Sequence, residues 1–435
     1  MVFAVPYGPG QLSYSLPAGL RVEVIEPVEV RAAENPTGAV EAALDAPVGG
    51  VDWESWRGAR SAAIAINDKT RPVPHEHLLP PLLRRLQRLG LAPEASQLII
   101  ASGTHPPVPP GEYPRVVPAE VLDRYPVFCH DADERESLAH LGVTSRGTPV
   151  WVNRRFAEAD LRLVVGNIEP HQFQGFSGGL KSAAIGLAGR ATIDHNHSLM
   201  SDPRARPGRY GDNPARQDVE EIGQIIGVHL ALNTILNTQK EIVHALAGEP
   251  GAVMEKGVRL SRSVCQVPVS APFDLVIASP GGHPKDINLY QSQKALAQAS
   301  LVTIDGGVVI LAAACPEGTG SQDYESWMAG VHSHDEVFVK FQREGFRIGP
   351  HKAFQLARDA SRVRTILVSE MPPELVWRLL LTPAEGIDEA LALVLPSLPS
   401  EARVGIVPQA TATIPLVSDR PSEIEFPDHT KRAKS

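Results

Sequence analysis

Short apolar runs, each stopped by glycine or polar residues, recur along the chain and predict buried strands. In the first half these runs are Ala62–Ile66, Gln97–Ala101 and Leu161–Val165. Between the first two, leucines recur at three- and four-residue spacing over His77–Leu89, which predicts an amphipathic helix. Apolar strands that alternate with helices are typical of a mostly parallel sheet covered on both faces. Before them, residues 1–30 alternate apolar and polar positions and predict a pair of strands with one exposed face.

The same alternation of strand and helix restarts in the second half of the chain. Phe273–Ala278 and Val308–Ala314 are strand candidates, and Asn288–Ala299 between them is compatible with a helix. Further strands are expected at Arg364–Val368 and Arg403–Val407. The predicted fold class is therefore α/β, with two α/β domains whose mostly parallel central sheets face an active-site cleft.

A proline-broken stretch at residues 266–272 interrupts this pattern and marks the expected domain boundary. It gives an N-terminal domain over residues 1–268 and a C-terminal domain over residues 269–417. The remaining tail, residues 418–435, is polar and contains prolines, so we expect it to be loosely ordered. The length of 435 residues also favours two domains over a single core.

The composition argues against several classes of protein. A formal net charge of −9 disfavours nucleic-acid binding, which requires clustered Lys and Arg. No apolar run reaches the length of a membrane span, and the N-terminus lacks the basic start and apolar segment of an export signal. The 3 cysteines lie far apart, which argues against a disulfide framework or an iron–sulfur site. We expect a cytoplasmic protein that binds neither membrane nor nucleic acid.

The turns that stop the three strands of the first half carry reactive side chains. Asp68 and Arg71 follow the first strand, His105 the second and His171 the third. Ligands of open α/β sheets bind outside the carboxyl ends of the strands, so these loops are expected to meet. Histidines there can act as acid and base near neutral pH, and arginine suits a carboxylate or phosphate. Singly, each has an ordinary interpretation, either as a capped turn or as a loop histidine bonded to the backbone.

The third loop continues through a glycine-rich stretch, Gly175–Gly179, into a helix-compatible run that begins at Leu180. Such a loop can direct backbone N–H groups at an anion, which suggests a phosphate-bearing cofactor. Its match to the Walker phosphate loop is loose, because that motif requires fixed glycine spacing. His195 and His197 come next and would form a zinc site with His171, but further ligands at zinc spacing are not evident.

One stretch of the second half also combines a cation with an amide. Gln291 and Lys294, in Tyr290-Gln-Ser-Gln-Lys294, are three residues apart on the expected helix and so share a face. Facing a cleft, this pair would suit an acidic substrate. The alternative is an ordinary solvated helix face.

Taken together, these stretches resemble the nickel-dependent lactate racemase family over nearly the whole chain. The motifs that carry the resemblance occur in order: Asp68-Lys-Thr-Arg-Pro72, Ser102-Gly-Thr-His105, His171 with Ser177-Gly-Gly-Leu-Lys181, Asn196-His197, and Tyr290-Gln-Ser-Gln-Lys294. Several ordered motifs with matching intervals are far more specific than any one of them.

The resemblance implies a nickel cofactor, pyridinium-3,5-bisthiocarboxylic acid mononucleotide, which binds the metal through sulfur, carbon and sulfur. Lys181 would hold it covalently as a thioamide, and His197 would supply the fourth nickel ligand, a donor set that suits Ni(II). The other cofactor contacts that we expect are Ser177, Gly178, Gly179, Asp68, Tyr290 and Phe354. Asp68 would otherwise orient Arg71, and Phe354 would otherwise be an ordinary core residue. Enzymes that synthesise the cofactor would be the partners needed for activation.

The implied reaction is racemisation or epimerisation of a 2-hydroxy acid by reversible hydride transfer. His105 and His171 would flank the substrate carbon as acid and base, and Arg71, Gln291 and Lys294 would hold the carboxylate. Family members that resemble lactate racemase also act on larger acids, including malate and sugar acids, so lactate is one candidate substrate. The stiff segment Pro106–Pro110 after His105 departs from the expected polar character and would reshape the pocket.

Two other classes of function remain as alternatives. A nicotinamide-dependent dehydrogenase would need a Gly-x-Gly-x-x-Gly turn after the first strand of a domain, and none is well placed. A two-domain carboxylate-binding protein without enzymatic activity would close on its ligand. That alternative gives no reason for a lysine and a histidine at cofactor-attachment spacing.

Overall fold

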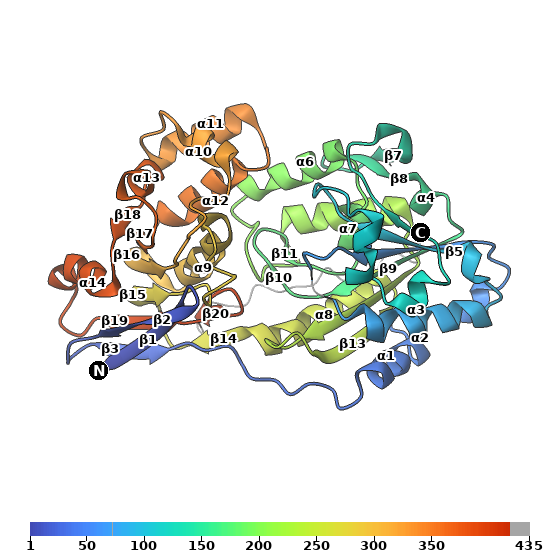
Figure 1. Cartoon of the computed structure of the whole chain (residues 1–435), viewed down its shortest axis with the longest axis horizontal. Coiled ribbons are helices and arrows are strands. Elements are labelled where there is room, and N and C mark those ends of the chain that lie inside the picture. The colour runs from blue at the N-terminus through green and yellow to red at the C-terminus, as the bar shows by residue number, and fades with distance from the viewer. Residues whose placement is uncertain (72, 418–435) are drawn as a thin grey trace. The chain divides into compact units, whose positions relative to one another are not determined.

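The computed structural model describes residues 1–71 and 73–417, which form two compact α/β units (Figure 1). One unit, called the catalytic unit below, is a continuous segment, Glu29–Val264. The other, the terminal unit, combines Met1–Val28 with the described residues from Cys265 to Val417. No helix of the described residues is long and apolar enough to cross a membrane.

The catalytic unit is built on a six-stranded sheet in the order β13-β12-β9-β4-β5-β6, in which only β13 is antiparallel to its neighbour. The strands are β4 (Ala62–Asn67), β5 (Ser96–Ala101), β6 (Val127–Cys129), β9 (Leu161–Asn167), β12 (Leu230–Leu236) and β13 (Ile242–Gly248). Successive side chains of a strand face opposite sides, so β4 directs Ile64 and Ile66 into the core with helices α1 (Pro36–Asp45) and α2 (His75–Arg88). Helices α5 (Lys181–Ala184), α7 (Pro214–Ile226) and α8 (Pro250–Cys265) complete the unit, and α5 packs against α7 and the strands β4 and β9.

The terminal unit has a second six-stranded sheet, which is parallel throughout and has the order β18-β17-β16-β15-β19-β3. Its strands are β15 (Phe273–Ala278), β16 (Thr303–Ala312), β17 (Arg364–Val368), β18 (Thr382–Ala384), β19 (Arg403–Val407) and β3 (Arg21–Val24). Helices α9 (Leu289–Leu301), α12 (His351–Ala360) and α14 (Ile387–Val394) belong to the same unit. The predicted α/β class with mostly parallel sheets is confirmed.

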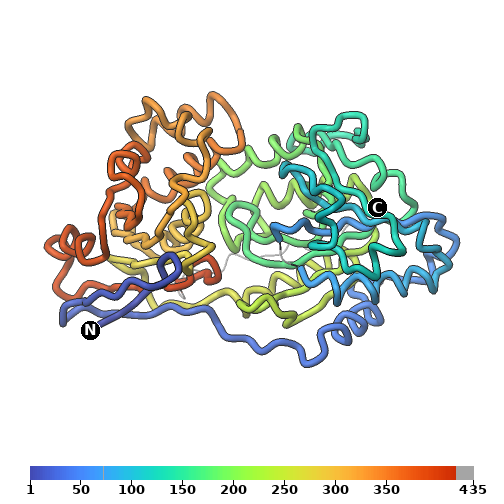
Figure 2. The backbone as a smooth tube through the Cα atoms, in the orientation of Figure 1, coloured from blue at the N-terminus to red at the C-terminus, as the bar shows by residue number. Residues whose placement is uncertain are grey.

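The assignment of residues 1–28 to the N-terminal domain is wrong. A hairpin of β1 (Val2–Tyr7) and β2 (Gly10–Ser15) packs on the core of the terminal unit, and β3 pairs in parallel with β19. Figure 2 shows the blue start of the chain running beside its red end within this unit. Buried Asp286 fixes the hairpin by accepting a hydrogen bond from the Gly8 N–H at 2.7 Å. The expected loose tail, residues 418–435, lies outside the described residues.

A buried histidine of the catalytic unit makes stability depend on pH. His130 is 0% exposed, its Nε2 contacts the Ala188 carbonyl at 2.9 Å, and its Nδ1 contacts the Asn153 amide. Burial lowers the pKa of His130 below its ordinary value. As pH falls through about 6.5, the unfolded chain therefore takes up this proton before the folded chain does, and the free energy of unfolding decreases.

We expect His130→Gln to flatten this pH dependence. Urea unfolding at several pH values between 7.5 and 5 should show a smaller loss of stability in the variant than in the wild type. Equal slopes for the two proteins would contradict the assignment, whatever the difference between their absolute stabilities.

Candidate active site

The loops at the carboxyl ends of β4, β5 and β9 surround a cavity of about 140 Å³ in the catalytic unit. We call it the strand-end cavity. Of the residues singled out in the sequence, it is lined by Asp68, Arg71, His105, His171, Ser177, Gly178, Lys181 and His197. Gly179 lies directly beside this lining. The structure thus brings together side chains that are more than a hundred residues apart in the chain.

His105 is held by a buried carboxylate. Its Nδ1 lies 2.8 Å from Oδ2 of Asp68, which is 4% exposed. Burial alone would raise the pKa of Asp68, but hydrogen bonds from His105 and Thr70 outweigh it and lower the pKa. Because an ionised carboxylate only accepts hydrogen bonds, Nδ1 of His105 carries the proton and Nε2 keeps its lone pair. The Asp68 carboxylate therefore orients His105, and the Asp68 carbonyl also accepts a hydrogen bond from the Arg71 N–H at 3.1 Å.

His171 is held in the opposite way. The backbone N–H of Gln174 donates to its Nδ1 at 3.2 Å, so the neutral ring carries its proton on Nε2. Phe173 packs edge-on against His171 with ring centres 4.8 Å apart, and against His197 at 4.9 Å. In the neutral rings, Nε2 of His105 is thus a hydrogen-bond acceptor and Nε2 of His171 is a donor.

The glycine-rich loop before Lys181 is fixed by internal hydrogen bonds. Ser177 Oγ contacts the Asn167 carbonyl at 3.1 Å, and the Gly179 N–H donates to Asn233 Oδ1 at 2.8 Å. The helix that follows, α5, spans only Lys181–Ala184 instead of the longer run expected from Leu180. The Gly179 N–H is therefore engaged by the protein itself, which weakens the initial picture of a helix N-terminus directed at a phosphate.

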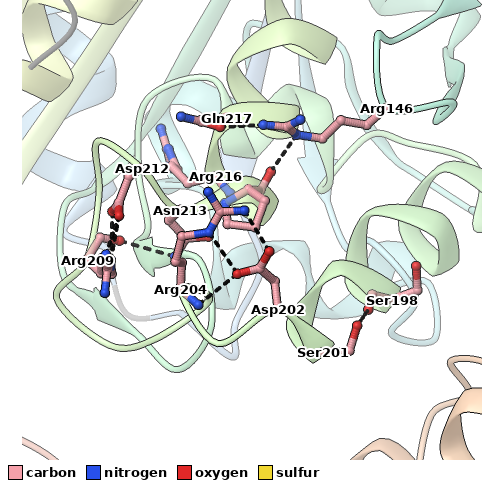
Figure 3. A network of polar contacts seen from close by, with 11 residues as sticks. Arg146, Ser198, Ser201, Asp202, Arg204, Arg209, Asp212, Asn213, Arg216 and Gln217 are labelled. Atoms are coloured by element: carbon pink, nitrogen blue, oxygen red, sulfur yellow. Dashed lines mark hydrogen bonds and ion pairs between the residues drawn. The ribbon is translucent and has the colours of Figure 1, made fainter.

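A buried arginine organises this loop from the side of α7. Arg216 is 1% exposed, and its guanidinium donates to the carbonyls of Phe176 at 3.1 Å and Gly178 at 3.2 Å. Its Nε donates to Glu220 at 2.7 Å, which balances the buried charge. Figure 3 shows Arg216 beside the start of α7, near the ion pair of Arg209 with Asp212. Nothing in the local sequence marks Arg216, because its partners are backbone carbonyls distant in the chain.

Burial and nearby cations disfavour the charged forms of Lys181 and His197. Burial lowers the pKa of Lys181 well below its ordinary value, and the charges of Arg71 and Arg216 act in the same direction against Glu169. Burial, assisted by the charges of Lys181 and Arg71, lowers the pKa of His197 to about 3, so its imidazole is neutral and can act as a metal ligand. A lowered pKa increases the share of lysine that is a neutral, nucleophilic amine. Both shifts therefore act in the direction that covalent attachment and metal coordination require.

Arg71 is tied to the third loop by a loose ion pair. Its guanidinium lies 3.9 Å from Glu169, which Lys240 approaches to the same distance from another side. The side chain of Arg71 is 41% exposed, so the ion pair is weak and leaves its fork accessible to an anion.

The structure gives His195 a different neighbour from His197. Nδ1 of His195 contacts Thr148 Oγ1 at 2.8 Å. Among residues 1–71 and 73–417, no group of three His, Cys, Asp or Glu side chains is arranged to hold a metal. A metal in the strand-end cavity would thus have to bring further donors with it.

The remaining predicted site residues belong to the terminal unit. Gln291 and Lys294 share a helix face as expected, since Lys294 Nζ donates to Gln291 Oε1 at 2.7 Å. Tyr290 lies under the ammonium of buried Lys352, 4.3 Å from the ring centre. Phe354 is stacked on Phe341 with ring centres 4.6 Å apart, an arrangement that fits an ordinary core residue.

Comparisons with known proteins agree with this architecture over most of the chain. Residues 7–208 match the lactate racemase N-terminal domain family, and residues 269–414 match the lactate racemase C-terminal domain family. The lactate racemase of Thermoanaerobacterium thermosaccharolyticum is 28% identical over 94% of this chain and 98% of its own length. That of Lactiplantibacillus plantarum is 29% identical over 86% of this chain and 90% of its own.

Solved structures give the same result. The lactate racemase apoprotein from T. thermosaccharolyticum superposes with a TM-score of 0.87, covering 96% of this chain and all (100%) of that one. A Thermotoga maritima protein, 19% identical with a TM-score of 0.63 over 89% of this chain, shares the fold. The protein is therefore an isomerase of the racemase type. It belongs to the lactate racemase family.

Gly179 provides a test of how tightly the lysine loop is packed. Its φ is +58°, and an added Cβ would lie 2.4 Å from Met254 Cγ. We expect Gly179→Ala to lower the free energy of unfolding by about 2–4 kcal/mol, because strain and a steric clash act together.

In a Met254→Ala background, which carries its own cost for the lost buried side chain, the further loss of stability caused by Gly179→Ala should be smaller, because only the backbone strain remains. Urea unfolding followed by circular dichroism measures both values. A Gly179→Ala protein as stable as the wild type would show that the loop is looser than described.

Proposed function

We propose that the chain racemises or epimerises a 2-hydroxy acid by reversible hydride transfer at the strand-end cavity. One observation supports this most directly. Lys181, His197, His105 and His171, which the family resemblance assigns to cofactor and substrate, line a single cavity. A dehydrogenase or a passive carboxylate-binding protein would not require a lysine and a histidine, both with lowered pKa values, in one cavity.

The residues present fit the nickel-bearing pyridinium mononucleotide implied by the family. Lys181 would hold it through a thioamide, and His197 would donate an imidazole nitrogen to nickel; the pKa values of both side chains are lowered, which favours these roles. Ser177, Gly178 and Gly179 would contact it through the loop that precedes Lys181. When bound, the pyridinium ring would take up the hydride from the substrate carbon and return it. Partner enzymes would have to synthesise this group.

The protein itself would manage the proton of the substrate hydroxyl. His105 would accept that proton at Nε2, and Asp68 would stabilise the imidazolium that forms. Loss of the proton and of the hydride leaves a planar 2-oxo acid. After hydride return to the opposite face, a proton must reach the new alkoxide, and His171 lines the same cavity to assist. For the other enantiomer the reaction would run in the reverse direction, from the state in which Nε2 of His171 has given up its proton and His105 is protonated.

The substrate carboxylate would be held by cations. Arg71 offers a half-exposed guanidinium fork at the cavity, and the resemblance adds Gln291 and Lys294 from the terminal unit. Tyr290 and Phe354 remain proposed cofactor contacts by resemblance alone. Lactate is the first candidate substrate, because both relatives compared above are lactate racemases. Malate and sugar acids are the next candidates.

Attachment of the cofactor tests the assignment of Lys181. When the chain is co-expressed with the cofactor-synthesis enzymes, intact mass should increase by one mononucleotide-sized adduct. The adduct should vanish in Lys181→Ala and persist in Lys256→Ala, a matched change of an exposed lysine. If the wild type carries neither adduct nor nickel, the proposed function fails.

The histidines should separate by role. We expect His105→Ala and His171→Ala to retain adduct and nickel yet lose at least about 100-fold in kcat, since positioned acid–base groups contribute roughly 10²–10⁴-fold. His140→Ala, a change of an exposed histidine, should leave kcat unchanged. Optical rotation with single enantiomers of lactate, malate and sugar acids would measure activity and identify the substrate. Loss of nickel in either active-site variant would mean that the residue holds cofactor instead.

A further inference from the structure

Gln174 connects the two halves of the candidate site. It is 0% exposed and lies between the strand segments Pro170–His171 and Gly175–Phe176. Its backbone N–H donates to Nδ1 of His171 at 3.2 Å, and its side-chain amide donates to Oδ1 of Asn196 at 2.8 Å. Asn196 precedes His197 on helix α6 (Arg190–Ser198). Gln174 therefore bonds directly to His171 and, through its side chain, to the residue that precedes His197.

Asn196 is in turn fixed by a buried carboxylate. Asn196 and Asp218 are both 0% exposed, and Nδ2 of Asn196 donates to Oδ2 of Asp218 at 2.9 Å. Asp218 also accepts hydrogen bonds from Thr144 at 2.7 Å and Thr148 at 2.9 Å. Since the hydroxyl proton of Thr148 is donated to Asp218, His195 must donate to Thr148 from Nδ1. The Asp218 carboxylate therefore accepts hydrogen bonds from Asn196, Thr144 and Thr148.

These hydrogen bonds set orientation and do not transfer protons. Two of the connections run through carboxamides, which hold their protons at neutral pH, so no proton path leads through them to His171. Buried hydrogen bonds of this kind rigidify the segments that they join, while Oε1 of Gln174 has no hydrogen-bond partner among the described residues. Phe173, packed between the rings of His171 and His197, fills the space that they enclose.

We propose that Gln174 and Asn196, held by Asp218, are positioning residues that keep His171 and His197 in one fixed arrangement. The proposal rests on the proposed function for its catalytic consequence. Its structural part concerns the hydrogen bond that sets the ring proton of His171. Sequence patterns assign no role to Gln174 or Asp218.

Gln174→Met tests the proposal, because it keeps volume and removes the amide. Gln174→Asn is the second variant, which stays polar but is too short to reach Asn196. Asn153→Leu is the matched control, because it removes another buried amide that bonds a histidine, His130, away from the cavity. Thermal unfolding of each variant allows comparison at matched stability.

The first measurement needs no cofactor. Both Gln174 variants keep the backbone N–H of residue 174, so they test whether the side-chain bond to Asn196 holds that N–H against Nδ1 of His171. Nitrogen-15 NMR of labelled histidine in the full chain, assigned with His171→Gln, should show His171 protonated at Nε2 in the wild type. In both Gln174 variants the released backbone should shift and leave His171 as a tautomer mixture. His105, held by Asp68, should keep its Nδ1 proton throughout and serves as the internal reference. An unchanged His171 signal in both variants would overturn the proposal.

The second measurement uses the cofactor-loaded enzyme. We expect kcat to fall about 10- to 100-fold in the Gln174 variants with KM changed less than about threefold, since misplacement near 1 Å can cost about 10²-fold in rate. The adduct at Lys181 should persist, and Asn153→Leu should keep its kcat. A fall in kcat no larger than in the control would overturn the proposal. If no acid is racemised even by wild type, the proposed function fails while the NMR result still decides the arrangement of His171.

Discussion

The buried guanidinium of Arg216 is the interaction on which the candidate site depends. It donates to the carbonyls of Phe176 and Gly178, so the lysine loop cannot move without leaving buried N–H donors unsatisfied, although Glu220 still balances the charge. Leaving such a buried donor unsatisfied costs roughly 1–3 kcal/mol, which is a large part of the stability of a domain. The same charge lowers the pKa of Lys181. One side chain thus couples loop geometry to the reactivity of the amine.

Much of the fold and the position of the site were predictable from the sequence. Apolar runs such as Leu161–Val165 carry a strong signal for buried parallel strands, and the rule that ligands bind beyond strand ends locates the site at Asp68, His105 and His171. The family resemblance added roles that local patterns do not contain. These roles remain proposals until adduct, nickel and turnover are measured.

The remainder depends on contacts between distant residues. Arg216 and Gln174 lie in unremarkable sequence, and their importance arises from partners brought close by folding. The sequence around Asp68 does not distinguish a carboxylate that pairs with His105 in another loop from one that only caps its own turn. The short edge strand β3 was predicted as a strand, but its partner β19 lies nearly four hundred residues away, and no local pattern encodes such a pairing.

That pairing has a consequence for synthesis of the chain. Residues 1–28 are synthesised long before Arg403–Val407, yet their sheet is complete only when that segment has been made. The continuous segment Glu29–Val264 can meanwhile fold as a unit, because its described sheet and core are internal to it. The candidate cavity would therefore form before the terminal unit has folded, while strand β3 still lacks its partner β19. Cofactor loading during translation becomes conceivable, and so does a period in which β1–β3 need protection from aggregation.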